Sequence, residues 1–575
     1  MQDVEHAGNI DVYGYSPSLG GFLAIGWIDL TWDDQFNSPA VTMTGESDRI
    51  IAEATVALFA REDVEKLGNG FVMFARADES RIGPLASITI ESNGEFYKLT
   101  RSESCKKYSE EQIIAHAKQL LGQAVPNQFR ARLHELLERP YYQGNNTLAE
   151  LQLCVHFEVD NIYFCPPRGF LILGWFLDPF GEVSRIRVRC GSSVCRVDPS
   201  TWISVRRADV VQGFAAKYGL PNDRVGFIAY VPEIHHPGES IYAEIEMRDG
   251  RIGFRPLQPA FFSGLPAIKE LLGRFTLRSD ELKEGFDNVF GPAVETMNAF
   301  RLLSRPDEDV LNFGAPIRSP RATIVVPLYG RVDFLEYQLA FFSQSLASDH
   351  EIIYVLDDPE RRLEVDALAA ACLAKFERPF TVIALAHNVG YAPANNVGLK
   401  HARGDHICFL NSDVFPGDPD WLELLIATEK SDESVGIVGA LLNYEDGTLQ
   451  HRGCAFERLP EFADWVFAIH PDKGRRVTLP ESHGAALAVT GACMVMTREL
   501  ALQLGGFDEG YVIGDFEDAD LCLRAGELGL SCLVDYRAQL YHLERQSQGQ
   551  SQPWRMNLTL YNAWRFQQRW RDHEF

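Results

Sequence analysis

The pattern of apolar and polar positions changes near residue 311 and divides the chain into two differently built parts. Before this point, short alternating segments separated by turn residues predict β-strands, with stretches of helical spacing between them. After it, short continuous apolar runs alternate with segments of helical spacing, which is typical of a βαβ series. The polar, proline-bearing stretch 306–320 is the predicted boundary.

The first part contains an internal duplication. Residues 21–27 (Gly-Phe-Leu-Ala-Ile-Gly-Trp) recur as residues 169–175 (Gly-Phe-Leu-Ile-Leu-Gly-Trp), and residues 70–74 are echoed by residues 226–230. The offset between the copies grows along the chain, which indicates an insertion in the second copy near residues 217–224. We therefore predict two small, mainly β modules, each a sandwich.

The two modules also share turn residues and the helical spacing that follows them. Asn93-Gly94 and Asp249-Gly250 each follow an alternating segment, which predicts a β-hairpin, and helical spacing follows each module. Residues 1–300 hold no catalytic constellation, and Trp27 and Trp175 are predicted as core residues rather than sugar-stacking platforms. The predicted divisions are a first β module at 1–105, a helical linker at 106–150, a second β module at 151–262, a helical linker at 263–310 and an α/β domain at 311–575.

The second part predicts a mostly parallel sheet with crossover helices. Ligands of such sheets bind outside the carboxyl ends of the strands, where polar residues stand in this chain. The predicted strands are 323–327, 351–356, 380–384 and 406–410, and the predicted helices are 332–346, 361–376 and 395–401. The polar residues at the strand ends are Tyr329, Asp357, Asp358, His387, Asn388, Asn411, Ser412 and Asp413.

An acidic stretch at 505–524 carries six carboxylates among apolar residues and glycines. A flexible loop is predicted to lead into a helix that begins at Glu517, with Asp518 facing inward from its first turn. An inward carboxylate at such a junction is a candidate general base. Two alternatives are that Asp518 is only a helix cap and that Asp520 merely pairs with Arg524 at i, i+4.

Charge and cysteine content narrow the class of protein. The 575 residues include 54 Lys and Arg against 80 Asp and Glu, a net charge of −26, which argues against a general nucleic-acid binder and against an anionic membrane as direct partner. Eleven cysteines without a C-x-x-C pair indicate reduced core residues, and the beginning of the sequence lacks signal-peptide character. No long apolar run is present, so we expect a cytoplasmic protein without a transmembrane segment.

Several motifs in order resemble family 2 glycosyltransferases of the GT-A fold, in particular the bacterial branch that builds O-antigen, capsule and other surface polysaccharides. The resemblance covers about residues 321–570. The motifs are Val-Pro at 326–327, Leu-Asp-Asp at 356–358, residues 388–396, residues 409–413, residues 446–451, Thr-Gly-Ala-Cys at 490–493, the acidic stretch 505–524 and Tyr-His at 541–542.

The resemblance implies a role for each matched residue. Asn411 to Asp413 match the Asp-x-Asp motif, with Asp413 as a ligand of Mg²⁺ or Mn²⁺ and Asn411 departing from the strict pattern. By itself an aspartate after a strand is also a common turn former. Asp518 matches the catalytic base and His542 a residue of the metal or diphosphate site, whereas a satisfied surface histidine is its alternative. The implied donor-binding residues are Pro327, Tyr329, Asp357, Asp358, Asn388, Gly390, Asn396, Asn411, Ser412 and Asp413, and the implied acceptor-side residues are Glu517, Asp515 and His451.

One base without a positioned nucleophile implies inversion by direct displacement, with a nucleotide-sugar donor and a glycan or lipid-linked glycan acceptor. A sugar nucleotidyltransferase is disfavoured because residues 327–331 are poor in glycine, and a non-catalytic glycan-binding or scaffold protein is the alternative. Residues 546–552 are predicted as a lid, and the last helix as packed on the domain or covering the acceptor cleft. Peripheral membrane or pathway-enzyme association and a homo-oligomer stay open.

Overall fold

The computed structural model describes residues 5–29, 40–45, 48–61, 69–77, 82–92, 95–151, 153–191, 193–219, 223–235, 240–479, 482–543 and 552–575. It divides into two compact units, Met1–Ala260 and Phe261–Phe575. All eleven cysteines lie in the described residues and none forms a disulfide. Among the described helices, none has both the length and the apolar character needed to cross a bilayer.

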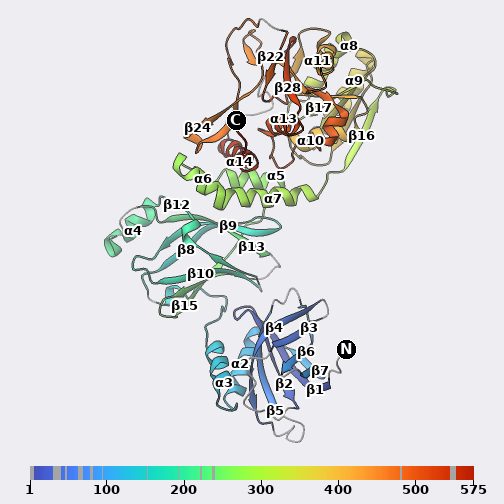
Figure 1. Ribbon diagram of the computed structural model, residues 1–575. Helices are drawn as coiled ribbons and strands as arrows, with labels where there is room; N and C mark the ends of the chain where they lie inside the picture. The colour runs from blue at the N-terminus through green and yellow to red at the C-terminus, as the bar shows by residue number, and fades with distance from the viewer. Residues whose placement is uncertain are drawn as a thin grey trace. The chain divides into compact units, whose positions relative to one another are not determined.

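The first module is a closed barrel, so the sandwich predicted for it is wrong (Figure 1). Its strands are β1 (Glu5–Ser16), β2 (Gly21–Ile28), β3 (Ala40–Gly45), β4 (Arg49–Phe59), β5 (Asn69–Arg76), β6 (Leu85–Ser92) and β7 (Glu95–Lys107), in the order β1-β2-β5-β4-β3-β6-β7. The sheet closes because β1 also pairs with β7 in parallel, which removes both edges. Strands β6 and β7 pair as expected, but the Asn93-Gly94 turn lies outside the described residues.

Two helices, α2 (Glu110–Leu121) and α3 (Gln128–Leu137), cover the outside of this barrel. Ile113 and Leu133 are fully buried against outward-facing barrel residues such as Leu23 and Val72. The predicted helical stretch is therefore confirmed, and it packs beside the barrel.

The second module is a sandwich of two sheets, as predicted. The strands are β8 (His156–Phe164), β9 (Arg168–Leu177), β10 (Val183–Cys190), β11 (Ser193–Val197), β12 (Ile203–Val205), β13 (Gly226–His235), β14 (Ile241–Met247) and β15 (Ile252–Leu257), in sheets β11-β10-β14-β15 and β12-β13-β9-β8. The expected hairpin joins β14 to β15, with Gly250 at φ 89° in its turn. Helix α4 (Ala208–Tyr218) occupies part of the region where the insertion was predicted, and residues 220–222 lie outside the described residues.

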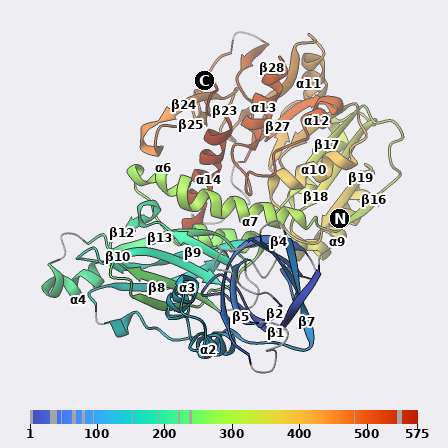
Figure 2. The ribbon, with the colours of Figure 1, turned by 60° about the horizontal axis from the view of Figure 1, so that its bottom comes forward.

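The second unit begins with a group of helices that pack against its last helix, α14 (Pro553–Arg569) (Figure 2). The group consists of α5 (Gly264–Leu272), α6 (Leu282–Gly285), a π-helical turn (Phe286–Phe290) and α7 (Gly291–Leu303). Asn557 Nδ2 donates to Leu272 O at 2.7 Å, and Trp564 Nε1 donates to Asp287 Oδ1 at 2.7 Å. Residues 264–303 are thus bound to the α/β domain by buried polar contacts as well as by apolar packing.

The α/β domain is built on one large sheet, whose strands follow the predicted order along the chain. The first strands are β16 (Glu308–Phe313), β17 (Ala322–Leu328), β18 (His350–Leu356), β19 (Phe380–Leu385), β20 (His406–Leu410) and β21 (Val414–Pro416), and the later ones are β22 (Val435–Asn443), β23 (Leu449–His451), β26 (His483–Ala486), β27 (Cys493–Thr497) and β28 (Ser531–His542). The helices are α8 (Phe334–Ser345), α9 (Arg362–Phe376), α10 (Tyr391–His401), α11 (Trp421–Glu429), α12 (Arg498–Gln503) and α13 (Glu517–Glu527), and β24 (Ala455–Leu459) and β25 (Trp465–Ile469) form a separate hairpin.

The sheet order runs β16-β19-β18-β17-β20-β27-β22-β28-β21. Strands β19, β18, β17 and β20 are parallel neighbours, so the chain winds one way from β17 to β19 and then crosses to β20 on the other side of β17. This reversal is a topological switch point, where ligands of open α/β sheets bind. β17 and β18 are buried over nearly their whole length because helices cover both faces. The predicted helix at 395–401 starts earlier, at Tyr391.

Candidate active site

Asp413 and His542 meet at the end of the switch-point strands. Asp413 follows β20, His542 ends β28, and Asp413 Oδ1 lies 3.3 Å from His542 Nε2. His542 Nδ1 lies 2.7 Å from Gln450 Oε1, which can only accept, so Nδ1 carries a proton. His542 Nε2 therefore either donates a proton to the Asp413 carboxylate or offers its lone pair to a cation that lies between the two side chains.

These two atoms fit a divalent metal ion. Neighbouring oxygen and nitrogen ligands of Mg²⁺ or Mn²⁺ lie about 3 Å apart when each is about 2.1 Å from the ion. The side-chain oxygen of Asn411 is also buried here and has no hydrogen-bond partner among the described residues. A carboxylate, an imidazole and an amide oxygen together are suitable ligands for such an ion, with a diphosphate completing the shell.

The backbone of residues 490–492 connects this pair to Asp518. Ala492 O accepts from Asn411 N at 2.9 Å, and Gly491 N donates to Asp518 Oδ2 at 2.8 Å. Gly491 O accepts from the Tyr391 hydroxyl at 2.8 Å. Burial and, after it, the carboxylates of Glu517, Asp518 and Asp413 raise the pKa of Tyr391 well above its ordinary value. Asp518, Tyr391 and the backbone of Asn411 therefore all bind one short backbone segment.

Asp518 stands in the first turn of α13, as predicted, and is only partly buried. Its Oδ1 accepts from Ala519 N at 2.8 Å, so two backbone N–H groups hold the carboxylate in place. Leu521 and Ala525 share its buried face, but Leu528, expected on that face, is 47% exposed because the helix has already ended at Glu527. The cap alternative also applies in part, since Asp518 binds a backbone N–H at the start of its own helix.

The loop before α13 has an unusual backbone. Ile513, Asp515 and Phe516 have φ values of 65°, 94° and 74°, in the left-handed region that non-glycine residues avoid. Each such residue costs about 1–2 kcal/mol, and the β-branched Ile513 is the least suited to it. Strained backbone of this kind persists only where neighbouring groups hold it, and it concentrates at functional sites.

Most of the other acids in this stretch are neutralised by arginines. Asp520, fully buried, pairs with Arg524 Nε at 2.8 Å, which confirms the i, i+4 pairing. Asp508 pairs with Arg565 at 3.0 Å and with Arg569 at 2.9 Å, and Asp515 pairs with Arg555 at 2.9 Å, all three arginines coming from α14. The last helix is therefore packed on the domain through the acidic stretch. The predicted lid at 546–552 lies, except for Gln552, outside the described residues.

Glu517 is buried rather than turned away from Asp518 as predicted. It is 6% exposed, and its Oε2 has no hydrogen-bond partner in the described part of the chain. Burial, with the nearby carboxylates of Asp518 and Asp515, raises the pKa of Glu517 well above its ordinary value. A neutral Glu517 can donate a hydrogen bond, but it is not a carboxylate nucleophile.

On the donor side, Asp357 organises the loop after β19. Its carboxylate accepts from Val389 N at 2.6 Å and Gly390 N at 2.8 Å, and from Asn388 Nδ2 at 2.9 Å. Burial raises the pKa of Asp357 to about 7, although these N–H groups and the Arg301 guanidinium act in the opposite direction. Asp357 is thus fully engaged within the protein.

The other donor-side candidates are partly exposed. Tyr329, which follows β17, is 45% exposed, and Pro327 on that strand is partly buried. Asp358 Oδ2 accepts from Gly330 N at 3.1 Å and lies 3.6 Å from Arg361 Nε. Ser412 is half-buried between Asn411 and Asp413.

Two residues predicted for the site, Asn396 and His451, instead make hydrogen bonds within the protein. Asn396 donates to Phe507 O at 2.8 Å and accepts from Phe507 N at 2.9 Å, so it ties α10 to the acidic stretch. His451 is completely buried and cannot touch an acceptor directly. Its Nε2 accepts from Thr490 N at 3.3 Å and its Nδ1 lies 2.8 Å from His470 Nδ1.

His451, His470 and Cys454 are the one His/Cys group in the described residues whose side chains could hold a metal. The Thr490 N–H occupies Nε2 of His451, so the proton sits on Nδ1 and is donated to His470. Burial lowers the pKa of His451 well below its ordinary value, with His470 and His542 adding to the shift. The two histidines are therefore a hydrogen-bonded pair beside the site.

Residues outside the predicted set also build the site. Arg301 on α7 donates to Val389 O at 2.9 Å and Asn298 donates to Glu509 O at 3.0 Å, so α7 fixes both the donor-side loop and the acidic stretch. Asn562 on α14 binds the strained loop. The sequence alone does not single out such an asparagine, because the backbone groups that it binds are distant in the sequence.

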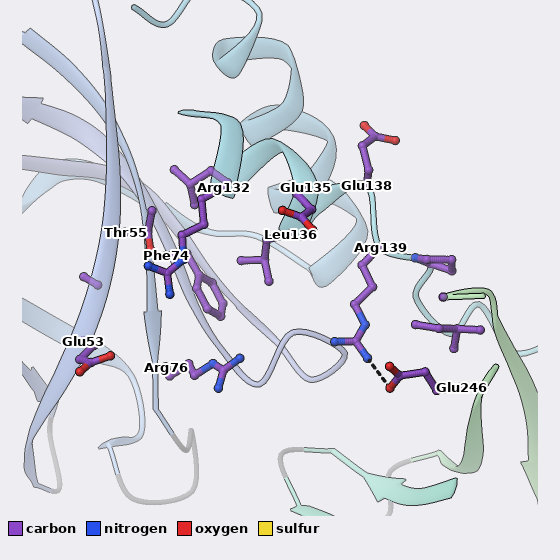
Figure 3. Close-up of a pocket in the computed structure, with 15 residues that line it drawn as sticks. Glu53, Thr55, Phe74, Arg76, Arg132, Glu135, Leu136, Glu138, Arg139 and Glu246 are labelled. Atoms are coloured by element: carbon purple, nitrogen blue, oxygen red, sulfur yellow. Dashed lines mark ion pairs between the residues drawn. The ribbon is translucent and has the colours of Figure 1, made fainter. Parts of the chain in front are cut away.

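A pocket of about 590 Å³ lies elsewhere, in the first unit, among β4, β5, α3 and the β14–β15 hairpin (Figure 3). Its walls alternate acids and arginines, such as Glu53, Arg76 and Arg132, and Arg139 lies 3.6 Å from Glu246 at one side. Among the described lining residues there is no histidine or cysteine, and the chemistry described above is absent from this pocket.

The strand order and the acids at the switch point define a doubly wound α/β domain with a binding site at the carboxyl ends of its strands. Residues 323–500, in the second unit, match the family described as Glycosyl transferase family 2. The chain is 31% identical over 238 residues to the O-antigen biosynthesis protein RfbC of Myxococcus xanthus, covering 40% of this chain and 18% of that protein. It is 28% identical over 264 residues to protein y4gI of Sinorhizobium fredii, covering 45% of this chain and 28% of that protein.

The matched region thus spans less than a third of the length of either relative. Similar solved structures include one titled GalNAc-T7 with UDP, GalNAc and Mn²⁺, with a TM-score of 0.34 and 16% identity over 44% of this chain and 49% of that chain. Another is the mannosyltransferase PcManGT from Pyrobaculum calidifontis with GDP-Man and Mn²⁺, with a TM-score of 0.29 and 18% identity over 53% of this chain and 83% of that chain.

Proposed function

We propose that this protein is a metal-dependent, inverting glycosyltransferase that moves a sugar from a nucleotide-sugar donor to a glycan or lipid-linked glycan acceptor. The observation that carries the proposal is that residues 490–492 bind Asp518 through Gly491 N and Asn411 through Ala492 O, while Asp413, two residues after Asn411, lies 3.3 Å from His542. The relative named for O-antigen biosynthesis supports a place in cell-surface polysaccharide synthesis. We expect a cytoplasmic protein, and its association with a membrane or with other enzymes stays open.

In this proposal each group has one task. Asp518, held by the N–H groups of Gly491 and Ala519, takes the proton of the acceptor hydroxyl as its oxygen attacks the anomeric carbon. The bond to the diphosphate breaks on the opposite face, which inverts the configuration. Glu517, buried and disfavoured as an anion, supplies no second carboxylate nucleophile, which supports direct displacement.

Asp413 and His542 would hold Mn²⁺ or Mg²⁺, with Asn411 and Ser412 beside them. The ion would neutralise charge that develops on the leaving diphosphate. The two side chains would hold it from different places in the sheet, after β20 and at the end of β28, and Gln450 orients the His542 ring. Tyr329 and Asp358 line the side where the nucleoside would lie.

The direct test is donor turnover by the wild type and by Asp518→Asn, across a panel of UDP-, GDP- and dTDP-sugars with Mn²⁺. We expect the wild type to hydrolyse or transfer one of them, and Asp518→Asn to lose about 10²–10⁴-fold in kcat while its nucleotide affinity stays the same. Nucleotide binding that needs no metal, with no turnover of any donor, would instead favour a non-catalytic scaffold.

We also propose that the two N-terminal modules arose by duplication, which their strand register supports. In the barrel Trp27 on β2 lies opposite Gly70 on β5, and in the sandwich Trp175 on β9 lies opposite Gly226 on β13. The repeated segments are therefore paired with each other in the same register in both modules. A one-residue slip would place every side chain on the other face, so the match is informative.

A bulge in the neighbouring strand supports the duplication further. The bulged residue is Asp11 in β1 and Asp160 in β8. Asp11 pairs with Arg61 at 2.5 Å and Asp160 pairs with Arg207 at 2.5 Å. Bulges are specific features of a fold rather than accidents, so the same charged bulge in both modules favours common descent over chance. Both modules would then serve related tasks, such as recognition of the growing glycan.

A further inference from the structure

The strained loop that leads into Asp518 needs support from outside itself. Val512 to Phe516 contains three left-handed non-glycine residues, and within the loop the structure shows one short backbone bond, from Gly514 N to Val512 O at 2.8 Å. A loop with this backbone relaxes unless neighbouring groups bind its polar atoms.

Asn562 on α14 makes three of these bonds. Its Oδ1 accepts from Val512 N at 3.0 Å, and its Nδ2 donates to Val512 O at 3.1 Å and to Gly514 O at 2.8 Å. The side chain is completely buried, so every polar atom of its amide is matched to the loop. An aspartate or a leucine could not make this set of bonds, because both donors and the acceptor are used.

The same face of α14 holds the next residues of the loop. Asp515 accepts from Arg555 Nη2 at 2.9 Å and from Thr559 Oγ1 at 2.8 Å. Positions 555, 559 and 562 follow i, i+4, i+7 spacing and so lie on one side of the helix. On its other side the loop is bound by α10, where Tyr391 N donates to Ile513 O at 2.8 Å.

We propose that Asn562 is a positioning residue for the sugar-transfer reaction. By binding Val512 and Gly514 it keeps the loop in its left-handed path, which places Glu517 at the start of α13 and aims the Asp518 carboxylate at the acceptor hydroxyl. The inference rests on the proposed glycosyltransferase function. It assigns a catalytic role to the docking of the C-terminal helix, which lies beyond the matched region 323–500.

Asn557 provides a matched control on the same helix. It is 6% exposed, and its Nδ2 also donates to two backbone carbonyls, Leu272 O at 2.7 Å and Phe275 O at 2.8 Å. These carbonyls belong to the end of α5 and the residues after it, away from the loop. Asn562→Leu and Asn557→Leu therefore remove the same amide from the same helix, and only the first releases the loop.

The experiment compares both variants with the wild type in hydrogen–deuterium exchange and in steady-state kinetics, with the donor that the panel identifies. We expect faster exchange at residues 512–516 and a fall in kcat of about 10- to 100-fold, with donor KM unchanged, for Asn562→Leu alone. Asn557→Leu should keep kcat within about 2-fold while losing similar thermal stability. If Asn562→Leu does not fold, Thr559→Val tests the same loop, with a smaller fall in kcat and again no change in KM.

Equal losses of kcat in the two asparagine variants, or exchange at 512–516 that does not respond to Asn562→Leu, would overturn the inference. A wild type that turns over no donor, while exchange responds as expected, would count against the glycosyltransferase function and would leave Asn562 as a purely structural clamp. The two failures are therefore distinguishable.

Discussion

Asp518 differs from the acids around it in what holds it. Asp508, Asp515 and Asp520 are bound by arginines, which occupy their carboxylates, whereas Asp518 is bound by the N–H groups of Gly491 and Ala519. Backbone N–H groups orient a carboxylate without pairing it to a cationic side chain. This difference separates the candidate base from its neighbours better than sequence spacing does.

His542 is expected to matter for metal affinity more than an exposed histidine at the same sheet edge. His542→Ala removes one ligand atom 3.3 Å from Asp413 and should weaken Mn²⁺ binding about 10- to 100-fold in isothermal titration with UDP present. His387→Ala, a change at an exposed position after β19, is the control and should leave Mn²⁺ affinity unchanged. Equal effects of the two substitutions would remove His542 from the metal site.

Asp357 should make stability depend on pH in a specific direction. Its pKa rises from 3.8 to about 7 on folding, so between these values the folded protein binds more protons than the unfolded chain. The contribution of this carboxyl to stability is therefore greatest below about pH 4, falls as pH rises, and is constant above about pH 7. As pH rises from about 4 to about 7, the Tm of the wild type should fall relative to the Tm of Asp357→Asn. A difference in Tm that does not depend on pH would contradict this prediction.

At the residue scale, the sequence could place acids at strand ends, because apolar runs that end in Asp or Asn are local patterns. It could also pair Asp520 with Arg524, four residues apart. It could not show that Asp357 and Asn396 are occupied by backbone N–H groups, or that His451 is buried, because those partners are tens of residues away. The arginines of α14 were missed for the same reason.

At the scale of elements, the buried ion network on β10 and β14 is the clearest feature of the sandwich. Arg187 lies directly opposite Glu244, and Glu244, 2% exposed, also pairs with Arg189 at 2.5 Å and Arg139 at 3.1 Å. Glu244 thus contacts three arginines, two of them buried, and Glu246 supplies a second carboxylate to Arg187 and Arg139. Such a network stabilises only while it is complete.

Glu244→Gln should therefore destabilise the first unit by about 3–5 kcal/mol, because it leaves the buried Arg189 guanidinium without its anion and Arg187 with Glu246 alone. Urea denaturation followed by fluorescence would measure this loss. Asp249→Asn breaks an exposed pair with Arg251, in which both side chains are about half exposed, and should cost less than about 1 kcal/mol. A loss for Glu244→Gln as small as that of the control would show that the arginines find other partners.

The elements themselves were largely predictable, because hydrophobic periodicity is local. The parallel strands, the sandwich and the helices beside the barrel appear where apolar patterns predicted them. The barrel was not predictable, because its closure depends on β1 pairing with β7, about ninety residues later, and the two copies have similar strand patterns. Copies with similar patterns thus form a closed barrel and an open sandwich.

For the whole molecule, the boundary between units lies at residues 260 and 261, before the predicted start of the α/β domain at 311. Residues 264–303 are fixed to α14 by Asn557 and Trp564, and Phe286 and Phe290 are completely buried. The sequence predicts a division at 262/263 as well as at 306–320, but it does not reveal that residues 264–303 pack with the α/β domain, because it does not show which helix pairs with which.

A chain truncated to 261–575 is therefore expected to fold, and one truncated to 311–575 is not. The shorter chain would expose the apolar face of α14 and leave the Asn557 amide without its carbonyl partners. Circular dichroism melting and gel filtration would compare them, with a cooperative transition expected for 261–575 alone. Equal melting of the two would show that α5–α7 add nothing to the domain.

The short segment 490–492 bonds to Asp518 through Gly491 N and to Asn411 through Ala492 O. If this short connection transmits a shift of Asn411 when a donor and its ion arrive, Asp518 moves as well. The enzyme would then bind its substrates in a compulsory sequence, with the donor first, and product inhibition patterns would reveal that order without any further structure.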